Sequence, residues 1–208
     1  SINQTNDANI FDDENYPEAY KKGYILFCDL KINVNQNVLI PRIETEKLVE
    51  LVIGYVKYIR SKNQADTTKT LKILEVGTGS GCIAVALAKY LDNIKVTAID
   101  ISSDALEVAK SNAQQHNVLE KIVFLQNDLL HNFHQHHDIV VCNLPYIPTD
   151  YIDKLDKSVK DFEPLIALDG GIDGFNIYRN LFKQIIDNKI DPELIIIEFD
   201  DTQTEISY

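Results

Sequence analysis

Residues 71–91 read LKILEVGTGSGCIAVALAKYL, and this stretch decides the fold. The apolar run LKILEV has the pattern of a buried strand, GTGSG that of a tight loop, and CIAVALAKYL that of a buried helix. Glycines allow a backbone to turn sharply and to approach a ligand closely. The stretch therefore predicts the first strand–loop–helix unit of a parallel sheet that binds a ligand at the carboxyl ends of its strands.

The alternation of strands and helices continues to the end of the chain. The predicted elements are the strand KVTAID, a helix over SDALEVAKSNAQQHN opened by Ser103 or Asp104, the strands IVFLQ and DIVVCN, the helix GFNIYRNLFKQII and the strand ELIIIEF. Strands that alternate with helices of this length indicate an α/β fold with a doubly wound, mostly parallel sheet.

Two elements are predicted ahead of the sheet. The run YILFCDLKINVNQNVL, residues 24–39, has the partial alternation of a β-hairpin that turns near Asn33 to Asn37. After Pro41, the run ETEKLVELVIGYVKYIR has the apolar spacing of an amphipathic helix, and the polar residues 61–70 form a linker into the sheet.

Composition limits the class of protein. The 208 residues are 45% hydrophobic, which suits one main α/β domain. Lys and Arg total 20 against 32 Asp and Glu, so the formal charge of −12 disfavours direct nucleic-acid binding. The three cysteines have no CxxC spacing and are expected to be reduced core residues. No apolar run has the length of a membrane span, and we expect a cytoplasmic protein without a membrane partner.

The glycine loop favours one cofactor over another. Gly77-Thr78-Gly79-Ser80-Gly81 has the spacing G-x-G-x-G, whereas a dinucleotide fingerprint has G-x-G-x-x-G. This spacing points to S-adenosylmethionine, which carries no phosphate. Asp100 ends the second strand, where its carboxylate can accept hydrogen bonds from both ribose hydroxyls. Asp128, after the third strand, is either an acceptor for the adenine amino group or part of an ordinary Asn-Asp turn.

The tetrapeptide Asn143-Leu144-Pro145-Tyr146 follows the fourth strand, beside the expected position of the reactive methyl group. The nitrogen of an amide or aromatic amine is a poor nucleophile, so an enzyme must hold its N–H groups in place. The Asn143 side-chain oxygen and the Leu144 carbonyl can accept those hydrogens, while Tyr146 offers a flat face and Pro145 fixes the backbone. The alternative is an ordinary Asn-x-Pro turn.

Three segments together resemble the HemK (PrmC) family of protein-glutamine N5-methyltransferases, from about Gly23 to about Phe199. They are LIPRIETE at 39–46, EVGTGSG paired with NLPYIP, and FEPLIALDGG at 162–171. The resemblance implies a Rossmann-like class I S-adenosylmethionine-dependent methyltransferase fold. It also implies that Asn143 to Tyr146 bind the glutamine in the GGQ loop of a peptide-chain release factor.

The resemblance assigns the cofactor site and the organisation of the chain as well. The S-adenosylmethionine site would be lined by Gly77 to Gly81, Asp100, Asp128, Leu129 and Asn143. Residues 1–22 would be a polar tail or the remnant of an amino-terminal helical domain, and residues 23–60 the hairpin arm and helix. Residues 71–208 would be a catalytic domain cut short at its carboxyl end. The family usually has NPPY, so Leu144 is a departure, although leucine supplies the same main-chain carbonyl.

Other interpretations remain open. NLPY also occurs in N6-adenine methyltransferases that act on RNA or DNA, and a non-catalytic module that binds S-adenosylmethionine is a further alternative. His131, His134, His136 and His137 invite a metal hypothesis, but without other ligands at suitable spacing they are expected to form a solvated loop, and no metal site is predicted. Arg42 is expected either near the cofactor or in a surface pair with Glu44 or Glu46.

Overall fold

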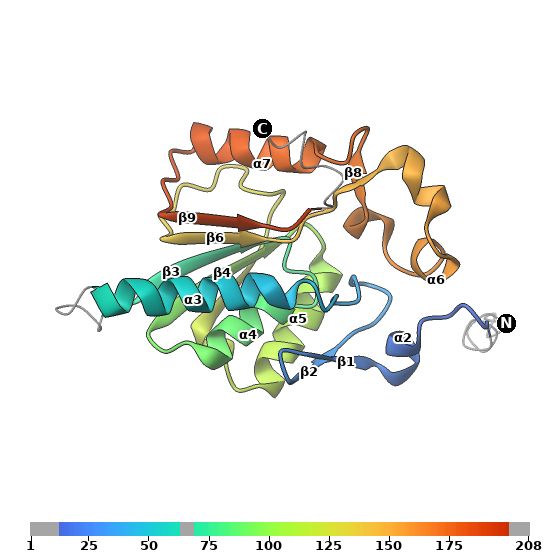
Figure 1. Ribbon diagram of the computed structural model, residues 1–208, viewed down its shortest axis with the longest axis horizontal. Coiled ribbons are helices and arrows are strands. Elements are labelled where there is room, and N and C mark those ends of the chain that lie inside the picture. Colours follow the sequence, from blue (N-terminus) through green and yellow to red (C-terminus); the bar gives the residue numbers. More distant parts are fainter. Residues whose placement is uncertain (1–12, 63–68, 200–208) are drawn as a thin grey trace, which may run out of the picture.

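The structure is a computed structural model that describes residues 13–62 and 69–199. Its centre is a sheet of parallel strands in the order β5-β4-β3-β6-β9, with helices on both faces (Figure 1). The strands of this sheet are β3 (Leu71–Val76), β4 (Ile94–Asp100), β5 (Ile122–Gln126), β6 (Ile139–Cys142) and β9 (Leu194–Ile197). The predicted doubly wound α/β fold is confirmed.

The remaining elements surround this sheet. The longer helices are α3 (Glu46–Lys62), α4 (Cys82–Tyr90), α5 (Ser103–Gln115) and α7 (Asn176–Asp187), and the short ones are α2 (Glu18–Lys22) and α6 (Lys157–Lys160). The small strands are β1 (Tyr24–Phe27), β2 (Leu30–Asn33), β7 (Ile147–Pro148) and β8 (Asp169–Gly171), and the 3₁₀ turns are η1 (Leu119–Lys121), η2 (Thr149–Lys154) and η3 (Leu165–Ala167).

The order of the strands places the ligand site. From the central strand β3 the chain proceeds outward through β4 and β5, then returns to the other side of β3 for β6 and β9. In the register of the central pair, Val76 faces Cys142, so Gly77 and Asn143 leave the sheet side by side. Ligands bind in open parallel sheets at the point where the strand order reverses, outside the carboxyl ends of the strands. The glycine loop and the NLPY tetrapeptide meet at that point.

Strand residues alternate between two apolar layers, as the pleat requires. Ile73, Val96 and Val141 belong to a large cluster that includes the buried sides of α3, α4 and α5. Leu74 and Val140 belong to a second cluster, which includes the buried face of α7. Because the strands are covered on both faces, they read as continuous apolar runs.

The predicted hairpin forms, but its turn was placed wrongly. β1 and β2 are joined at Cys28 and Asp29, whose φ angles of 47° and 60° give the left-handed pair of a two-residue hairpin turn. The residues Asn33 to Asn37 instead lead out of β2. Tertiary contacts hold the turn, since the Cys28 N–H donates to Glu46 at 2.7 Å and the Tyr90 hydroxyl donates to the Cys28 carbonyl. Cys28 is therefore a part-exposed turn residue, while Cys82 and Cys142 are buried as expected.

Helix α5 begins at Ser103, the first residue of the predicted helix, but neither Ser103 nor Asp104 caps it. The cap is Ser102, whose hydroxyl oxygen accepts the Ala105 N–H at 3.2 Å.

Of the predicted linker, residues 61–70, the first two are the last residues of α3, and 63–68 lie outside the described residues. Of the predicted tail or remnant, residues 1–22, the part from 13 to 22 is described: it contains α2, and Tyr16 and Tyr20 are buried in the core. Residues 1–12 and 200–208 lie outside the described residues. In the described ranges, no helix has the length and apolar character needed to cross a membrane.

Candidate functional site

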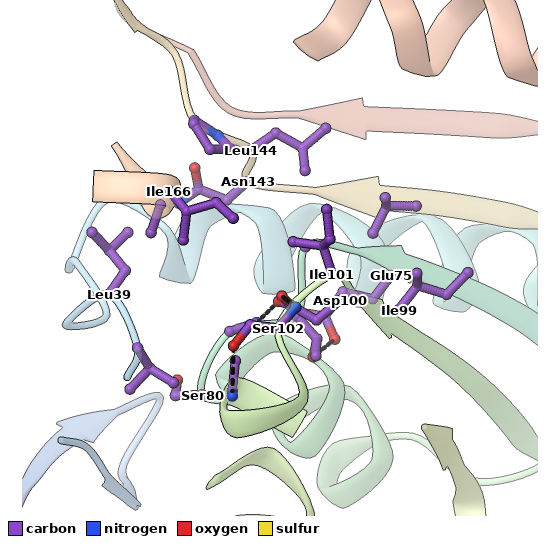
Figure 2. Close-up of a pocket in the computed structure, with 18 of the residues that line it drawn as sticks. Leu39, Glu75, Ser80, Ile99, Asp100, Ile101, Ser102, Asn143, Leu144 and Ile166 are labelled. Atoms are coloured by element: carbon purple, nitrogen blue, oxygen red, sulfur yellow. Dashed lines mark hydrogen bonds between the residues drawn. The ribbon is translucent and has the colours of Figure 1, made fainter. Parts of the chain in front are cut away.

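A cavity of about 350 Å³ opens at the carboxyl edge of the sheet, between the glycine loop and the NLPY tetrapeptide. This volume lies in the range of small-molecule sites. Figure 2 shows Asn143 and Leu144 on one side of the cavity, with Asp100 and Ser102 on the other. The predicted site residues that line it are Gly77, Thr78, Gly79, Ser80, Asp100, Asp128, Leu129, Asn143, Leu144 and Pro145.

Two predicted residues do not line this cavity. Gly81 lies against helix α5, where an added Cβ would come within 2.9 Å of the Ala109 Cβ. Tyr146 is part-buried against the second apolar cluster, and its hydroxyl lies 3.5 Å from Glu198 Oε1. Gly81 therefore allows two helices to approach closely. The roles predicted for both residues stay predictions.

Gly77 and Gly79 are needed in the loop for different reasons, one for close contact and one for backbone conformation. An added Cβ on Gly77 would lie 2.6 Å from Leu144 Cδ2, so Gly77 allows the two loops to touch. Gly79 has a φ of +53°, and an added Cβ there would meet nothing within 4 Å. Gly79 is therefore needed for its backbone conformation, and the space beside it is open for a ligand.

Asp100 stands at the end of β4 with both carboxylate oxygens tied to the backbone. Oδ2 accepts the Gly79 N–H at 2.8 Å, and Oδ1 accepts the Ser102 N–H at 2.9 Å. Burial raises the pKa of this carboxyl above its usual range, against these hydrogen bonds. A carboxylate offers about four acceptor positions, so Asp100 can still accept hydrogen bonds from two hydroxyls of a ligand.

Glu75 is a cavity residue that the sequence reasoning did not assign. Its side chain is 1% exposed; Oε2 accepts the Thr78 hydroxyl at 2.7 Å, and Oε1 has no hydrogen-bond partner among the described residues. Burial raises its pKa to about 8. A buried acceptor without a partner suits a cationic ligand group. The signal in the sequence was the acidic residue at the strand end before GTGSG.

The lining fits S-adenosylmethionine better than a dinucleotide. Glu75 and Asp100 are acceptors that suit a ligand with ammonium and hydroxyl groups. Arg42 is the one Lys or Arg among the described lining residues, and its guanidinium is paired with Glu163. The phosphates of a dinucleotide would favour cationic donors, and the one guanidinium of the described lining is already paired.

The NLPY tetrapeptide is held by residues from distant parts of the chain. Asn143 Nδ2 donates to Thr45 Oγ1, which lies just before α3, and to Glu198 Oε1 just after β9, at 3.0 Å each. The Leu144 N–H donates to the Tyr178 hydroxyl at 3.0 Å, and that hydroxyl donates to the Glu198 carbonyl. Asn143 Oδ1 accepts no hydrogen bond from the described residues and is available to a ligand.

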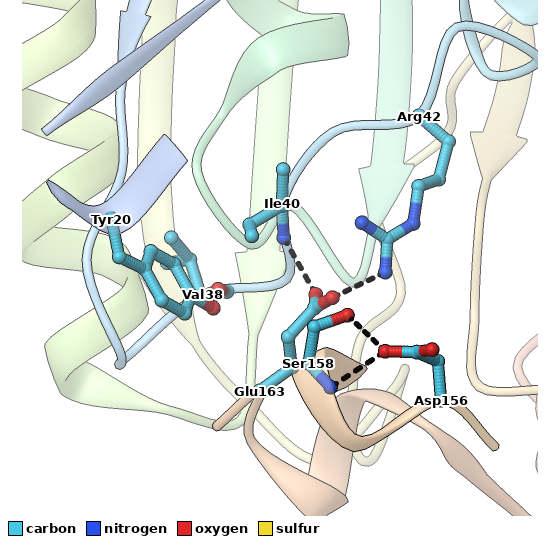
Figure 3. A network of polar contacts seen from close by, with 7 residues as sticks. All are labelled: Tyr20, Val38, Ile40, Arg42, Asp156, Ser158 and Glu163. Carbon is cyan, nitrogen blue, oxygen red and sulfur yellow. Dashed lines mark hydrogen bonds and ion pairs between the residues drawn. The ribbon is translucent and has the colours of Figure 1, made fainter. Parts of the chain in front are cut away.

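Arg42 joins two of the three segments that carried the family resemblance. Its guanidinium donates to Glu163 Oε1 at 2.5 Å, and the Ile40 N–H donates to Glu163 Oε2 at 3.0 Å. Figure 3 shows these contacts meeting at the one carboxylate. The Glu163 side chain is almost fully buried, so LIPRIETE and FEPLIALDGG are clamped together by one carboxylate. Both segments line the cavity, through Pro41 and Pro164 among others. Of the positions expected for Arg42, the surface pair with Glu44 or Glu46 is wrong.

The histidine-rich segment does not lie wholly in solvent. His137 is 2% exposed, and one ring nitrogen lies 2.9 Å from the Thr97 hydroxyl. Burial lowers its pKa, so the ring is held neutral. The solvated-loop interpretation is therefore wrong for His137, which is a buried packing residue.

Comparison with known proteins identifies the family. Residues 57–167, more than half of the chain, match the family model described as ribosomal protein L11 methyltransferase (PrmA). A release factor glutamine methyltransferase of Lactococcus lactis is 39% identical over 89% of this chain and 64% of its own length. One of Rhodopirellula baltica is also 39% identical, over 89% of this chain and 62% of its own. The chain thus spans less than two thirds of these relatives.

Solved structures agree on the fold. The catalytic domain of hMettl16, solved in complex with a 3′UTR hairpin, superposes with a TM-score of 0.61 at 15% identity, covering 86% of this chain and 64% of that one. A likeness at this identity concerns the fold alone. The chain belongs to the S-adenosylmethionine-dependent methyltransferases by its match to the L11 methyltransferase model, and it is a relative of the release factor glutamine methyltransferases, the HemK (PrmC) family.

Proposed function

We propose that this protein transfers the methyl group of S-adenosylmethionine to the N5 amide nitrogen of the glutamine in the GGQ loop of a peptide-chain release factor. The observation that carries the proposal is Asn143. Both hydrogens of its side-chain amide are engaged, by Thr45 and Glu198, and its Oδ1 remains available at the cavity that the glycine loop and Asp100 also line. The names of the relatives narrow the acceptor to a release factor glutamine.

The chemistry demands positioning more than a strong base. An amide nitrogen has a delocalised lone pair, so it reacts only when it is aimed at the methyl carbon. Asn143 Oδ1 and the Leu144 carbonyl would each accept one N–H of the glutamine amide, which fixes the plane of the amide. When bound, the cofactor supplies an electrophilic methyl group on a sulfonium. The cofactor sulfur would keep the electron pair of the S–C bond, and the acceptor nitrogen would release one proton to solvent.

Leucine at position 144, where the family usually has proline, is compatible with binding the acceptor amide. The proposed contribution of this position is its carbonyl oxygen, which leucine and proline share. Leucine also has an N–H, and the Tyr178 hydroxyl accepts it at 3.0 Å, so no donor is left unpaired in the core. We place the reaction in the cytoplasm, where peptide-chain termination takes place, and without direct nucleic-acid or membrane partners.

A labelling experiment tests the proposal. The protein and labelled S-adenosylmethionine are incubated with a GGQ-containing release factor, with the same factor after its GGQ glutamine is replaced by alanine, and with ribosomal RNA. We expect label only on the unmodified release factor. Label on RNA would favour the N6-adenine alternative. Label on no substrate, with cofactor binding intact in calorimetry, would favour a non-catalytic module.

A further inference from the structure

Glu198 is a part-buried carboxylate that none of the proposed chemical steps uses. It lies directly after β9, at the carboxyl edge of the sheet, and its Oε1 accepts an N–H of Asn143. Its Oε2 is buried and has no partner among the described residues. A buried polar atom without a hydrogen bond costs about 1–3 kcal/mol of stability. Unsatisfied buried polar atoms are few in folded proteins, so one on the residue that contacts Asn143 calls for an explanation.

The backbone of Glu198 is fastened to the NLPY tetrapeptide as well. Its N–H donates to the Cys142 carbonyl at 3.2 Å, one residue before Asn143. Its carbonyl accepts the hydroxyl of Tyr178, and the same hydroxyl accepts the N–H of Leu144. Because backbone and side chain are both tied to this loop, the position of the Glu198 carboxylate relative to Asn143 is fixed.

A carboxylate in this position decides which way the Asn143 amide faces. The amide of asparagine has a donor end and an acceptor end, and either can face a hydroxyl, because a hydroxyl both donates and accepts. Thr45 alone therefore does not fix which end of the Asn143 amide faces it. A carboxylate only accepts, so it selects the Nδ2 end of Asn143. Thr45 Oγ1 accepts the other N–H of Asn143 Nδ2, at 3.0 Å.

We infer that Glu198 is a positioning residue that holds the Asn143 amide with Oδ1 toward the cavity, where it accepts an N–H of the acceptor amide. The inference rests on the proposed function, because it concerns the acceptor of that reaction. In the opposite orientation Nδ2 would face the acceptor, and an N–H of Asn143 would then point at an N–H of the acceptor amide. Glu198 thus selects for acceptors that carry hydrogen on the reacting nitrogen.

The protonation state of Glu198 gives the inference a pH signature. Burial raises the pKa of its carboxyl above the usual value of 4.5; nearby Glu44 adds to the rise, and the hydrogen bonds from Thr45, Tyr146 and Asn143 oppose it. Tyr178 on α7 also faces it, through its hydroxyl. A protonated carboxyl can donate as well as accept, so Asn143 is no longer held in one orientation. Activity should therefore fall as pH drops through the Glu198 pKa.

The test compares Glu198→Gln with Glu193→Gln. Glu193 directly precedes the same strand at its other end and is exposed, so it controls for loss of an acidic residue from this region. The amide introduced at position 198 would present both a donor and an acceptor, so it would not hold the Asn143 amide in one orientation. We therefore expect Glu198→Gln to lower kcat on the release factor about tenfold and to leave the Kd for S-adenosylmethionine unchanged. The acid limb of the kcat–pH profile should be absent from Glu198→Gln and present in Glu193→Gln.

A second measurement needs no acceptor. The side-chain amide signals of Asn143 in ¹H–¹⁵N spectra, identified by their absence from Asn143→Asp, should titrate with a midpoint above 4.5. Glu198→Gln should abolish that titration, whereas Glu44→Gln should only lower its midpoint. Asn143 signals that stay constant with pH in the unsubstituted protein would overturn the inference.

The two measurements separate the inference from the proposed function. If the protein labels the release factor and Glu198→Gln keeps the full kcat, the positioning role is wrong and the proposed function stands. If no release factor is labelled but the Asn143 signals titrate with Glu198, the positioning role stands and the proposed function is wrong. In an Asn143→Ala background, Glu198→Gln should cause no further loss of kcat, and an additional tenfold loss would contradict the inference.

Discussion

The two sides of the cavity are built in different ways. The proposed cofactor side consists of the glycine loop, which follows β3, and Asp100, which ends the neighbouring strand β4 and accepts the Gly79 N–H. The proposed acceptor side consists of Asn143 and Leu144, which are held by Thr45, Tyr178 and Glu198 from three other parts of the chain. The contacts of the first side join two consecutive strand–loop units, whereas those of the second side join segments far apart in the sequence. Substitutions on the first side should therefore change the Kd for S-adenosylmethionine, and those on the second side kcat or Tm.

The largest effect is expected on the acceptor side, from Asn143→Ala. This substitution removes the oxygen that would accept an N–H of the acceptor amide, and groups of this kind contribute about 10²–10³ in kcat. The Kd for S-adenosylmethionine should change by less than about threefold, because the glycine loop and Asp100 remain. Kinetics and calorimetry on the same preparation measure both. Unchanged turnover would refute the acceptor role of Asn143.

Asp100→Asn should produce the converse pattern on the cofactor side. It removes the charge that would accept ribose hydroxyls and replaces one acceptor of the loop with a donor. Hydrogen bonds to charged groups contribute about 1.5–3 kcal/mol, so the Kd for S-adenosylmethionine should rise about 10- to 100-fold. At saturating cofactor, kcat should stay within a few fold. Asp104→Asn, in the first turn of α5, is the control and should bind normally. An unchanged Kd in Asp100→Asn would remove Asp100 from the site.

Tyr178→Phe tests whether the acceptor side depends on tertiary contacts. The substitution leaves the Leu144 N–H and the Glu198 carbonyl without their buried partner. A loss of about 1–3 kcal/mol is expected, which corresponds to a fall in Tm of roughly 5 °C for a chain of this length. Tyr58→Phe, an exposed tyrosine on α3, should leave Tm unchanged. Thermal melts measure both Tm values, and equal values for the two variants would contradict the role of the Tyr178 hydroxyl.

The smallest effect concerns Glu75 and depends on pH. Its pKa is raised to about 8 by burial, whereas in the unfolded chain it is near 4.5. The folded state thus retains a proton that the unfolded state loses, and stability falls as pH rises from about 4.5 to about 8. Glu75→Gln cannot lose a proton and should be more stable than the unsubstituted protein by a few degrees of Tm at pH 8, with little difference at pH 5.

Melts of the cofactor-free protein across this range measure the Glu75 effect. Glu120→Gln, an exposed residue in η1, should show no such pH-dependent gain. A constant difference in Tm between Glu75→Gln and the unsubstituted protein at all pH values would show that Glu75 does not titrate in this range.

The sequence by itself determined the α/β fold, the strands of its parallel sheet, and the proximity of the glycine loop to Asp100. Periodicity separates strands from helices, and the glycine loop and Asp100 follow strands that pair with each other, so their proximity can be read from the order of elements. The tertiary structure alone decided the hairpin turn at Cys28, the pairing of Arg42 with Glu163, and the contacts of Asn143 with Thr45 and Glu198. These partners lie far apart in sequence, and hydrogen bonds between distant side chains leave no periodic signal; only the packed sheet and helices bring them within reach.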